Sequence, residues 1–275
     1  MSRILMIDPE PHLLEALGAS PVLCGHEIVA AHGDVDALRR LRFGAFDVLL
    51  TSATTTVEED LVLLDEIRRI RPGVRTIVLT ERVAREDVIA ALSARVFALF
   101  SRPFDAGDIA AMVSGAMSSA PGHEGIMILS GLPDWLAVRL DCSLLTAERV
   151  LRYIAELRTE VADADREGLL LAYREVLLSA IEHGAGRAAG KLVDVAAVRT
   201  QRALVFYVKD PGPGFAPPRL PPGMVAGAPV PREFAARWGE DSQAEEYRLL
   251  VARTIVDEML YNERADEVIL IKHTA

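Results

Sequence analysis

Short apolar runs alternate with amphipathic segments through the first 120 residues, and this alternation constrains the fold more than any other feature of the sequence. The runs cover residues 4–7, 26–30, 46–51, 76–80 and 96–100. Apolar strands separated by helical segments are typical of a parallel sheet that is buried on both faces, with the helices as crossovers. We therefore predict a five-stranded, doubly wound α/β domain whose ligand site lies at the carboxyl ends of its strands.

Composition excludes several classes of protein. A chain of 275 residues is long enough for roughly two domains, each with its own core. The net charge of −10 is divided evenly between residues 1–120 and the rest, so no basic surface is available and direct binding to nucleic acid is not expected. No apolar stretch is long enough to be a signal peptide or a membrane span. Cys24 and Cys142 form no paired motif and the histidines have no metal-binding spacing, which favours a reduced cytoplasmic protein without a metal centre.

Polar residues stand at the ends of the predicted strands. Asp8, Ser52 and Thr80 end three of them and Arg102 follows a fourth. With the stretches 4–11, 46–52, 77–80 and 101–104, these residues make the sequence over residues 1–120 resemble the receiver domain of two-component response regulators. The resemblance implies a flavodoxin-like fold that accepts a phosphoryl group on an aspartate after the third strand. An acid pair that holds Mg²⁺, a Thr or Ser, and a Lys before Pro would assist.

The departures from the receiver pattern fall where the chemistry is. Ser52 occupies the phospho-acceptor position, and a serine is a poor nucleophile without an adjacent base. Pro9 replaces one acid of the Mg²⁺ pair, Arg102 replaces the lysine, and Leu99 stands in place of the switch aromatic, whereas Thr80 is unchanged. We predict a pseudo-receiver that cannot take phosphate by the usual route. Its polar cluster either closes the top of the sheet or retains a docking or anion-sensing role.

A second domain is predicted after a short linker. A helix over residues 105–117 leads into a small, polar stretch with Pro and Gly, so we place the linker at 121–125, between domains 1–120 and 126–275. The second domain is predicted to be an α+β sandwich. We expect strands at 135–140, 192–198, 203–208 and 267–272, and helices at 147–162, 166–185 and 248–260. Tyr261 and Asn262 are expected to stop the last helix, and Trp135 and Trp238 to pack in the core or at an interface.

Two motifs give the second domain its candidate site. Glu175, Ser179 and His183 lie at i, i+4 and i+8 of one predicted helix and so share a face. Asp210 leaves a predicted strand ahead of Gly212 and Gly214, which let the backbone pass close to a ligand. With the tail at 249–262 and 267–272, the segments 174–184 and 210–214 resemble the Bergerat-type ATPase domain of gyrase, histidine kinases and anti-sigma-factor serine kinases, the last group most closely.

This second resemblance assigns roles and exposes further departures. Asp210 would bind the adenine amino group, the glycines would line the pocket, and Glu175 would orient or activate the attacking group. Ser179 replaces the asparagine that completes the Mg²⁺ shell, which weakens the metal site. Glu246, Tyr247 and Arg248 stand where the family has Gly-x-Gly at the mouth of a phosphate-binding helix; Glu246 repels an anion there and Arg248 offsets this only in part.

The lid between these segments is unusually rich in proline. Eight prolines lie between Pro211 and Pro231. Proline removes amide donors and favours extended geometry, so the lid is either an arm that faces a partner protein or a plain solvated loop.

These departures favour a bacterial signal-transduction regulator in which a pseudo-receiver is joined to a degenerate serine-kinase-like ATPase domain. We expect it to act by protein–protein binding, in the manner of partner switching, with little or no phosphotransfer. The expected partner is a sigma factor, an anti-sigma antagonist or a kinase, and a homodimer is plausible. Two alternatives stay open: an active ATP-dependent protein serine kinase with Glu175 as base, or an allosteric regulator that binds ATP without hydrolysing it. ATP and Mg²⁺ are therefore doubtful ligands.

Overall fold

The computed structural model describes residues 1–120, 124–157, 163–186, 188, 190–213 and 243–274. The chain divides into two compact units, Met1–Glu124 and Gly125–Ala275. Within the described ranges, none of the helices has the length and apolar character needed to cross a membrane.

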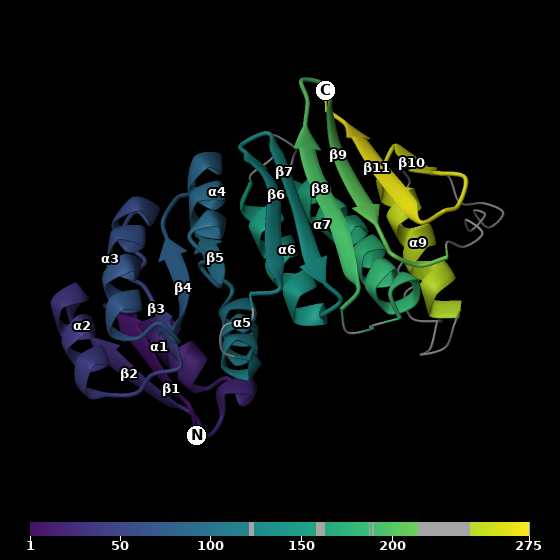
Figure 1. The fold of residues 1–275 in the computed structure, drawn as a ribbon. Coiled ribbons are helices and arrows are strands. Elements are labelled where there is room, and N and C mark those ends of the chain that lie inside the picture. Colours follow the sequence, from purple (N-terminus) through teal and green to yellow (C-terminus); the bar gives the residue numbers. More distant parts are fainter. Residues whose placement is uncertain (121–123, 158–162, 187, 189, 214–242, 275) are drawn as a thin grey trace. The chain divides into compact units, whose positions relative to one another are not determined.

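The first unit contains one parallel sheet between two layers of helices (Figure 1). Its strands are β1 (Arg3–Ile7), β2 (Glu27–Ala31), β3 (Val48–Leu50), β4 (Arg75–Thr80) and β5 (Ala98–Ser101), in the order β2-β1-β3-β4-β5. Its helices are α1 (Pro11–Gly18), α2 (Gly33–Phe43), α3 (Val57–Ile70), α4 (Arg85–Ser93) and α5 (Ala106–Ser118), with a 3₁₀ turn at Pro21–Leu23. This order is the flavodoxin-like one, which confirms the predicted fold.

Because helices cover both faces of its sheet, the first unit buries the side chains of its central strands. Leu5 and Leu49 on the central strands are fully buried, and α2 and α3 pack Leu41 and Ile67 against them. The helix over 105–117 begins as predicted, because the Asp105 side chain accepts a hydrogen bond from the Asp108 N–H and caps α5.

The second unit is an antiparallel sheet with helices on one face (Figure 1). Its strands are β6 (Ile126–Leu132), β7 (Trp135–Asp141), β8 (Leu192–Arg199), β9 (Ala203–Lys209), β10 (Glu258–Tyr261) and β11 (Glu267–His273), in the order β10-β11-β9-β8-β7-β6. Its helices are α6 (Leu144–Glu156), α7 (Asp163–Ser179), which continues as a π-helical turn at Ala180–Gly184, and α9 (Gln243–Ile255). The predicted α+β sandwich is confirmed.

The structure of the second unit differs from the predictions in four places. The last helix ends at Ile255 and not at residue 260, because the Asp257 N–H donates to the Ile271 carbonyl and pairs the following residues with β11. Tyr261 and Asn262 accordingly lead into a hairpin turn and do not stop a helix. Strand β6 was not predicted, and α6 begins at Leu144 because Ser143 caps it. The predicted continuation of α6 through residues 158–162, most of the linker and Trp238 lie outside the described residues.

Candidate functional site

The predicted polar residues of the first unit lie at the carboxyl edge of its sheet. Asp8 is exposed, with a backbone φ of +41°, and its Oδ1 accepts a hydrogen bond of 3.0 Å from the Gly33 N–H. Ser52 and Thr80 are buried. The Ser52 hydroxyl lies 2.9 Å from the Thr54 hydroxyl, which is not a general base and so does not activate it as a nucleophile.

Arg102 is engaged by a residue that the sequence analysis missed. Its guanidinium forms an ion pair with the Glu10 carboxylate and lies 4.9 Å from the centre of the Phe104 ring. Glu10 stands two positions after Asp8, beyond Pro9, and an acid this close to the strand end was the available signal. Arg102 stands at the position where the lysine of a receiver domain would contact the phosphoryl group. In this chain the charge of Arg102 is instead paired with Glu10 of the same unit.

A second missed residue is the buried acid Asp60 on α3, whose exposed fraction is 2%. The Thr51 hydroxyl donates to its Oδ2 at 2.7 Å and the Thr55 hydroxyl lies 2.9 Å from its Oδ1. Burial raises the pKa of Asp60 to about 7, although these two hydroxyl hydrogen bonds lower it. The Thr55 hydroxyl is also 2.7 Å from the Ser52 carbonyl oxygen, so Asp60 connects the Ser52 loop to α3.

In the second unit, Arg248 on α9 joins two carboxylates on α7 and its π-helical turn. Its Nη1 lies 2.7 Å from Glu182 Oε2 and its Nε lies 3.3 Å from Glu175 Oε2. Ser179, buried at the end of α7, comes between these two acids in the chain. Burial raises the pKa of Glu175, while Arg248 and Arg174 lower it. His183, predicted to share a face with Glu175, is exposed. The residue that contacts Arg248 together with Glu175 is Glu182.

Asp210 lies against the π-helical turn, and two glycines make this approach possible. Its Oδ1 accepts a 2.6 Å hydrogen bond from the Gly212 N–H, and its own N–H donates to the Asp266 carbonyl at 3.0 Å. A Cβ on Gly184 would lie 2.2 Å from Asp210 Cγ, and one on Gly212 would lie 2.5 Å from the Gly184 carbonyl oxygen. Both positions therefore require glycine for packing reasons. Gly214 and the rest of the proline-rich lid lie outside the described residues, as do the side chains of Glu246 and Tyr247.

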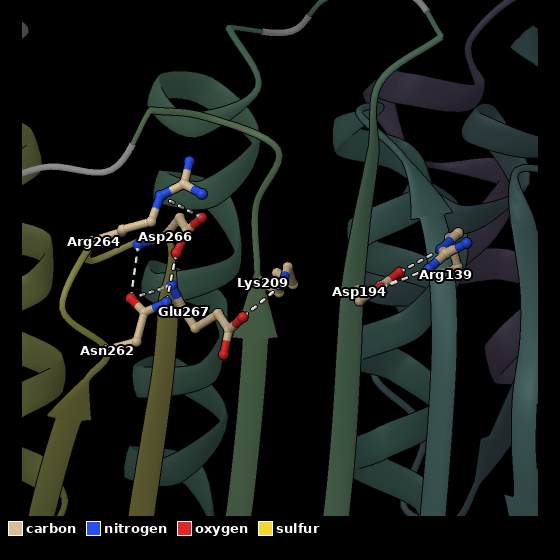
Figure 2. Close-up of polar contacts among 7 residues, drawn as sticks. All are labelled: Arg139, Asp194, Lys209, Asn262, Arg264, Asp266 and Glu267. Carbon is tan, nitrogen blue, oxygen red and sulfur yellow. Dashed lines mark hydrogen bonds and ion pairs between the residues drawn. The ribbon is translucent and has the colours of Figure 1, made fainter.

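The turn that joins β10 to β11 lines a pocket together with Asp210. Figure 2 shows the polar side chains of this turn. The Asn262 Nδ2 group donates to Asp266 Oδ1 at 2.6 Å, and the Asp266 N–H donates back to Asn262 Oδ1 at 3.1 Å. Arg264 adds an ion contact of 3.6 Å to Asp266, and the Asn262 hydrogen bond lowers the pKa of that acid. The turn holds Tyr261, whose pKa is raised by burial, at the edge of the cavity.

The cavity enclosed by these walls is small. It has a volume of about 20 Å³ and is lined by residues that include Ser179, Gly184, Asp210, Leu249 and Tyr261. Such a space holds about one water molecule. Among the described residues, no group of three or more His, Cys, Asp or Glu side chains is placed to hold a metal ion.

Comparison with known proteins found matches for both parts of the chain. Residues 137–272 match the family model of the histidine kinase-like ATPase domain. The N-terminal part is similar to the transcriptional regulatory protein GlrR of Escherichia coli K12, with 27% identity over 124 residues, 45% of this chain and 28% of that protein. A response regulator receiver protein of Anaeromyxobacter is 31% identical over 103 residues, 38% of this chain and 43% of that protein. The chain thus spans less than half the length of these curated relatives.

Two solved structures from response-regulator proteins are similar to part of the chain. A CheY-like receiver domain protein from Methanospirillum hungatei is 21% identical and covers 42% of this chain and 94% of its own, with a TM-score of 0.37. A response regulator from Thermotoga maritima is 21% identical and covers 43% and 99%, with a TM-score of 0.39.

The chain joins a receiver domain to a histidine kinase-like ATPase domain, as the sequence predicted. Because residues 137–272 match an ATPase domain, ATP is a candidate ligand of the second unit.

Proposed function

We propose that this chain is a signalling protein that acts by binding other proteins, with little or no phosphotransfer at either of its two candidate sites. The observation that carries the proposal is the 20 Å³ cavity beside Asp210, with Arg248 paired to Glu175 and Glu182 next to it. A nucleotide would have to widen this cavity and to compete with two carboxylates for Arg248.

Electrostatics at α7 and α9 support the same proposal. Arg248 contacts Glu175 and Glu182, and Arg174 contacts Glu175 and Glu148. Three carboxylates and two guanidiniums leave this group of side chains with a formal charge of −1, which disfavours a polyphosphate at close range. Ser179 offers a hydroxyl where the family has an amide carbonyl, so it is a poorer ligand for Mg²⁺. The residues present therefore do not fit a metal-bound triphosphate.

The first unit supports the proposal independently. Ser52 contacts a hydroxyl rather than a base, and Arg102 is paired with Glu10. Both residues stand where a phosphorylated receiver needs an ionised acceptor and a cation that faces the phosphoryl group. We therefore infer a pseudo-receiver whose carboxyl edge serves as a docking surface. The partner class expected from the resemblance is a sigma factor, an anti-sigma antagonist or a kinase.

One observation favours the alternative of an active protein serine kinase. Glu175 is partly buried with a raised pKa, which is the property of a general base. In that function Glu175 would accept the proton of the substrate hydroxyl while Asp210 holds the adenine amino group. A regulator that binds ATP without turnover needs only the second of these roles.

Two measurements separate these functions. Treatment of the full chain with acetyl phosphate, followed by mass spectrometry, is expected to leave residues 1–120 without an adduct. Incubation with labelled ATP, Mg²⁺ and a candidate partner is expected to transfer no label. A phosphoryl adduct on the first unit would overturn the pseudo-receiver, and label on the partner that disappears in a Glu175→Gln variant would establish the kinase.

A further inference from the structure

Among the described residues of the second unit, no helix lies against one face of its sheet. Helices α6, α7 and α9 cover the other face, where Val138, Phe206 and Leu270 are almost completely buried. Because successive side chains of a strand point to opposite faces, the neighbours of these residues lie on the open face. That face is apolar over much of its area: Leu132, Trp135 and Leu260 are 56%, 51% and 47% exposed. Exposed apolar patches of this kind are typical of protein interfaces.

Four charged residues form a row across the open face, one on each of four neighbouring strands. In strand order they are Arg139 on β7, Asp194 on β8, Lys209 on β9 and Glu267 on β11, at matching positions of the register. Arg139 holds Asp194 through two contacts of 2.6 and 2.8 Å, and Lys209 lies 2.5 Å from Glu267 (Figure 2). We name this row the charge ladder. Its charges alternate as positive, negative, positive, negative.

The charge ladder is complementary to itself. Its midpoint falls between β8 and β9, which is also the middle of the six-stranded sheet. Suppose that a second copy packs its open face against this one, related by a two-fold axis that runs parallel to the strands at this midpoint. The charge ladder of the second copy then crosses the interface in the opposite strand order. Arg139 then faces Glu267 of the partner subunit, and Asp194 faces Lys209 of the partner subunit. We propose that this open face is the interface of a homodimer in which two such sheets pack face to face.

The apolar rows beside the charge ladder fit the same axis. One row places Ala137, Ala196, Tyr207 and Ile269 on the same four strands, and the axis sets each alanine against a large side chain. The alanine of β7 faces the isoleucine of β11, and the alanine of β8 faces the tyrosine of β9. Small residues opposite large ones allow two sheets to interdigitate at the usual separation of about 10 Å.

The area is sufficient for a stable dimer. Six strands about 4.8 Å apart and about seven residues long, at roughly 3.4 Å per residue, give a face of about 700 Å². Two such faces bury about 1,400 Å² in total, which is within the usual range for specific complexes.

Paired charge reversals test the proposed interface in the full chain by sedimentation velocity. One double variant, Arg139→Glu with Asp194→Arg, keeps the contact between β7 and β8 but sets like charges against each other at all four positions of the dimer. The second, Lys209→Glu with Glu267→Arg, does the same from the other half of the ladder. We expect the wild-type chain to be a dimer and each double variant to dissociate at least 100-fold more readily.

The mixture of the two double variants is the discriminating sample. In a heterodimer of the two double variants, each of the four ladder positions of one chain faces an opposite charge on the other chain. We therefore expect an equimolar mixture to form a heterodimer although neither variant alone forms a dimer. If a double variant loses its cooperative thermal transition, Ala196→Arg on the open face replaces it, with Val62→Arg on α3 as the exposed control. A monomeric wild type at 100-micromolar concentration, dimeric double variants, or no heterodimer on mixing would each overturn the proposal.

Discussion

Substitution of Gly184 by alanine is the sharpest test of how tightly the π-helical turn packs against Asp210. The added Cβ would lie 2.2 Å from Cγ and 2.7 Å from Cβ of Asp210, whereas carbon atoms in contact are normally about 3.5–4.0 Å apart. The overlap exceeds an ångström, so either the turn or Asp210 has to move.

Movement of Asp210 is costly because its side chain and its backbone are both held. Its Oδ1 accepts the 2.6 Å hydrogen bond from Gly212, and its N–H is tied to the Asp266 carbonyl. Overpacking of a well-packed site costs about 1–3 kcal/mol, and loss of a hydrogen bond costs roughly 1 kcal/mol more. We therefore expect Gly184→Ala to lower the free energy of unfolding of the second unit by about 2–4 kcal/mol.

The assay is urea unfolding followed by circular dichroism, with Gly18→Ala as the matched control. Gly18 ends α1, and an added Cβ there would meet no atom within 4 Å. The control is expected to be neutral or to stabilise the protein by up to about 1 kcal/mol, because alanine loses less chain entropy on folding. If Gly184→Ala shifts the unfolding midpoint no more than the control does, the described contact between Gly184 and Asp210 is wrong.

Three further predictions follow from the structure. In the folded state, the pKa of Asp60 is raised from 3.8 to about 7. Between pH 4 and pH 7 the folded state therefore keeps a proton on Asp60 that the unfolded state has lost. The free energy of unfolding of the first unit should fall by up to a few kcal/mol as the pH rises through this range. Asp60→Asn should remove most of this slope in urea titrations at several pH values, and an unchanged slope would refute the assignment. Arg248→Ala should lower the free energy of unfolding by about 1–3 kcal/mol in the same assay, because it leaves Glu175 and Glu182 without their shared cation. The control Arg264→Ala, at an exposed ion pair, should lower it by less than about 1 kcal/mol. Equal losses for the two variants would contradict this prediction. Tyr173 stacks on Phe206 with ring centres 4.1 Å apart. Tyr173→Ala should therefore lower the free energy of unfolding of the second unit by about 3–5 kcal/mol, and Tyr173→Phe, which keeps the ring, by far less. Similar losses for both variants would refute the stacking argument.

The sequence predicted the first unit almost completely because each buried strand is a short apolar run with clear limits. The five runs at 4–7, 26–30, 46–51, 76–80 and 96–100 lie within two residues of the observed strands at every boundary. Parallel strands covered on both faces are apolar on both faces, so the pattern needs no knowledge of the tertiary contacts.

The errors in the second unit come from short segments whose structure is decided by distant residues. Residues 258–261 continue the apolar spacing of α9, and only their pairing with β11 makes them a strand. Four residues are too few to separate a helical period from an alternating one. Strand β6 has exposed apolar residues such as Met127 and Leu129 on the open side, so its pattern was not one of a half-buried strand.

The candidate sites were predicted only in part, for a related reason. Asp8, Ser52, Thr80, Glu175 and Asp210 were named from local motifs. Glu10, Asp60 and Glu182 were not, because their roles depend on Arg102, Thr51 and Arg248, which come from other parts of the chain. Ion pairs and buried hydroxyl contacts of this kind have no fixed spacing in a sequence.

We propose that the pocket beside Asp210 does not take a metal-bound nucleotide. Isothermal titration of the full chain with ATP in the presence of Mg²⁺ tests it most directly, with ATP injected into buffer as the blank. We expect heats equal to the blank at every injection. A saturable isotherm with micromolar affinity that is lost in an Asp210→Asn variant would contradict it.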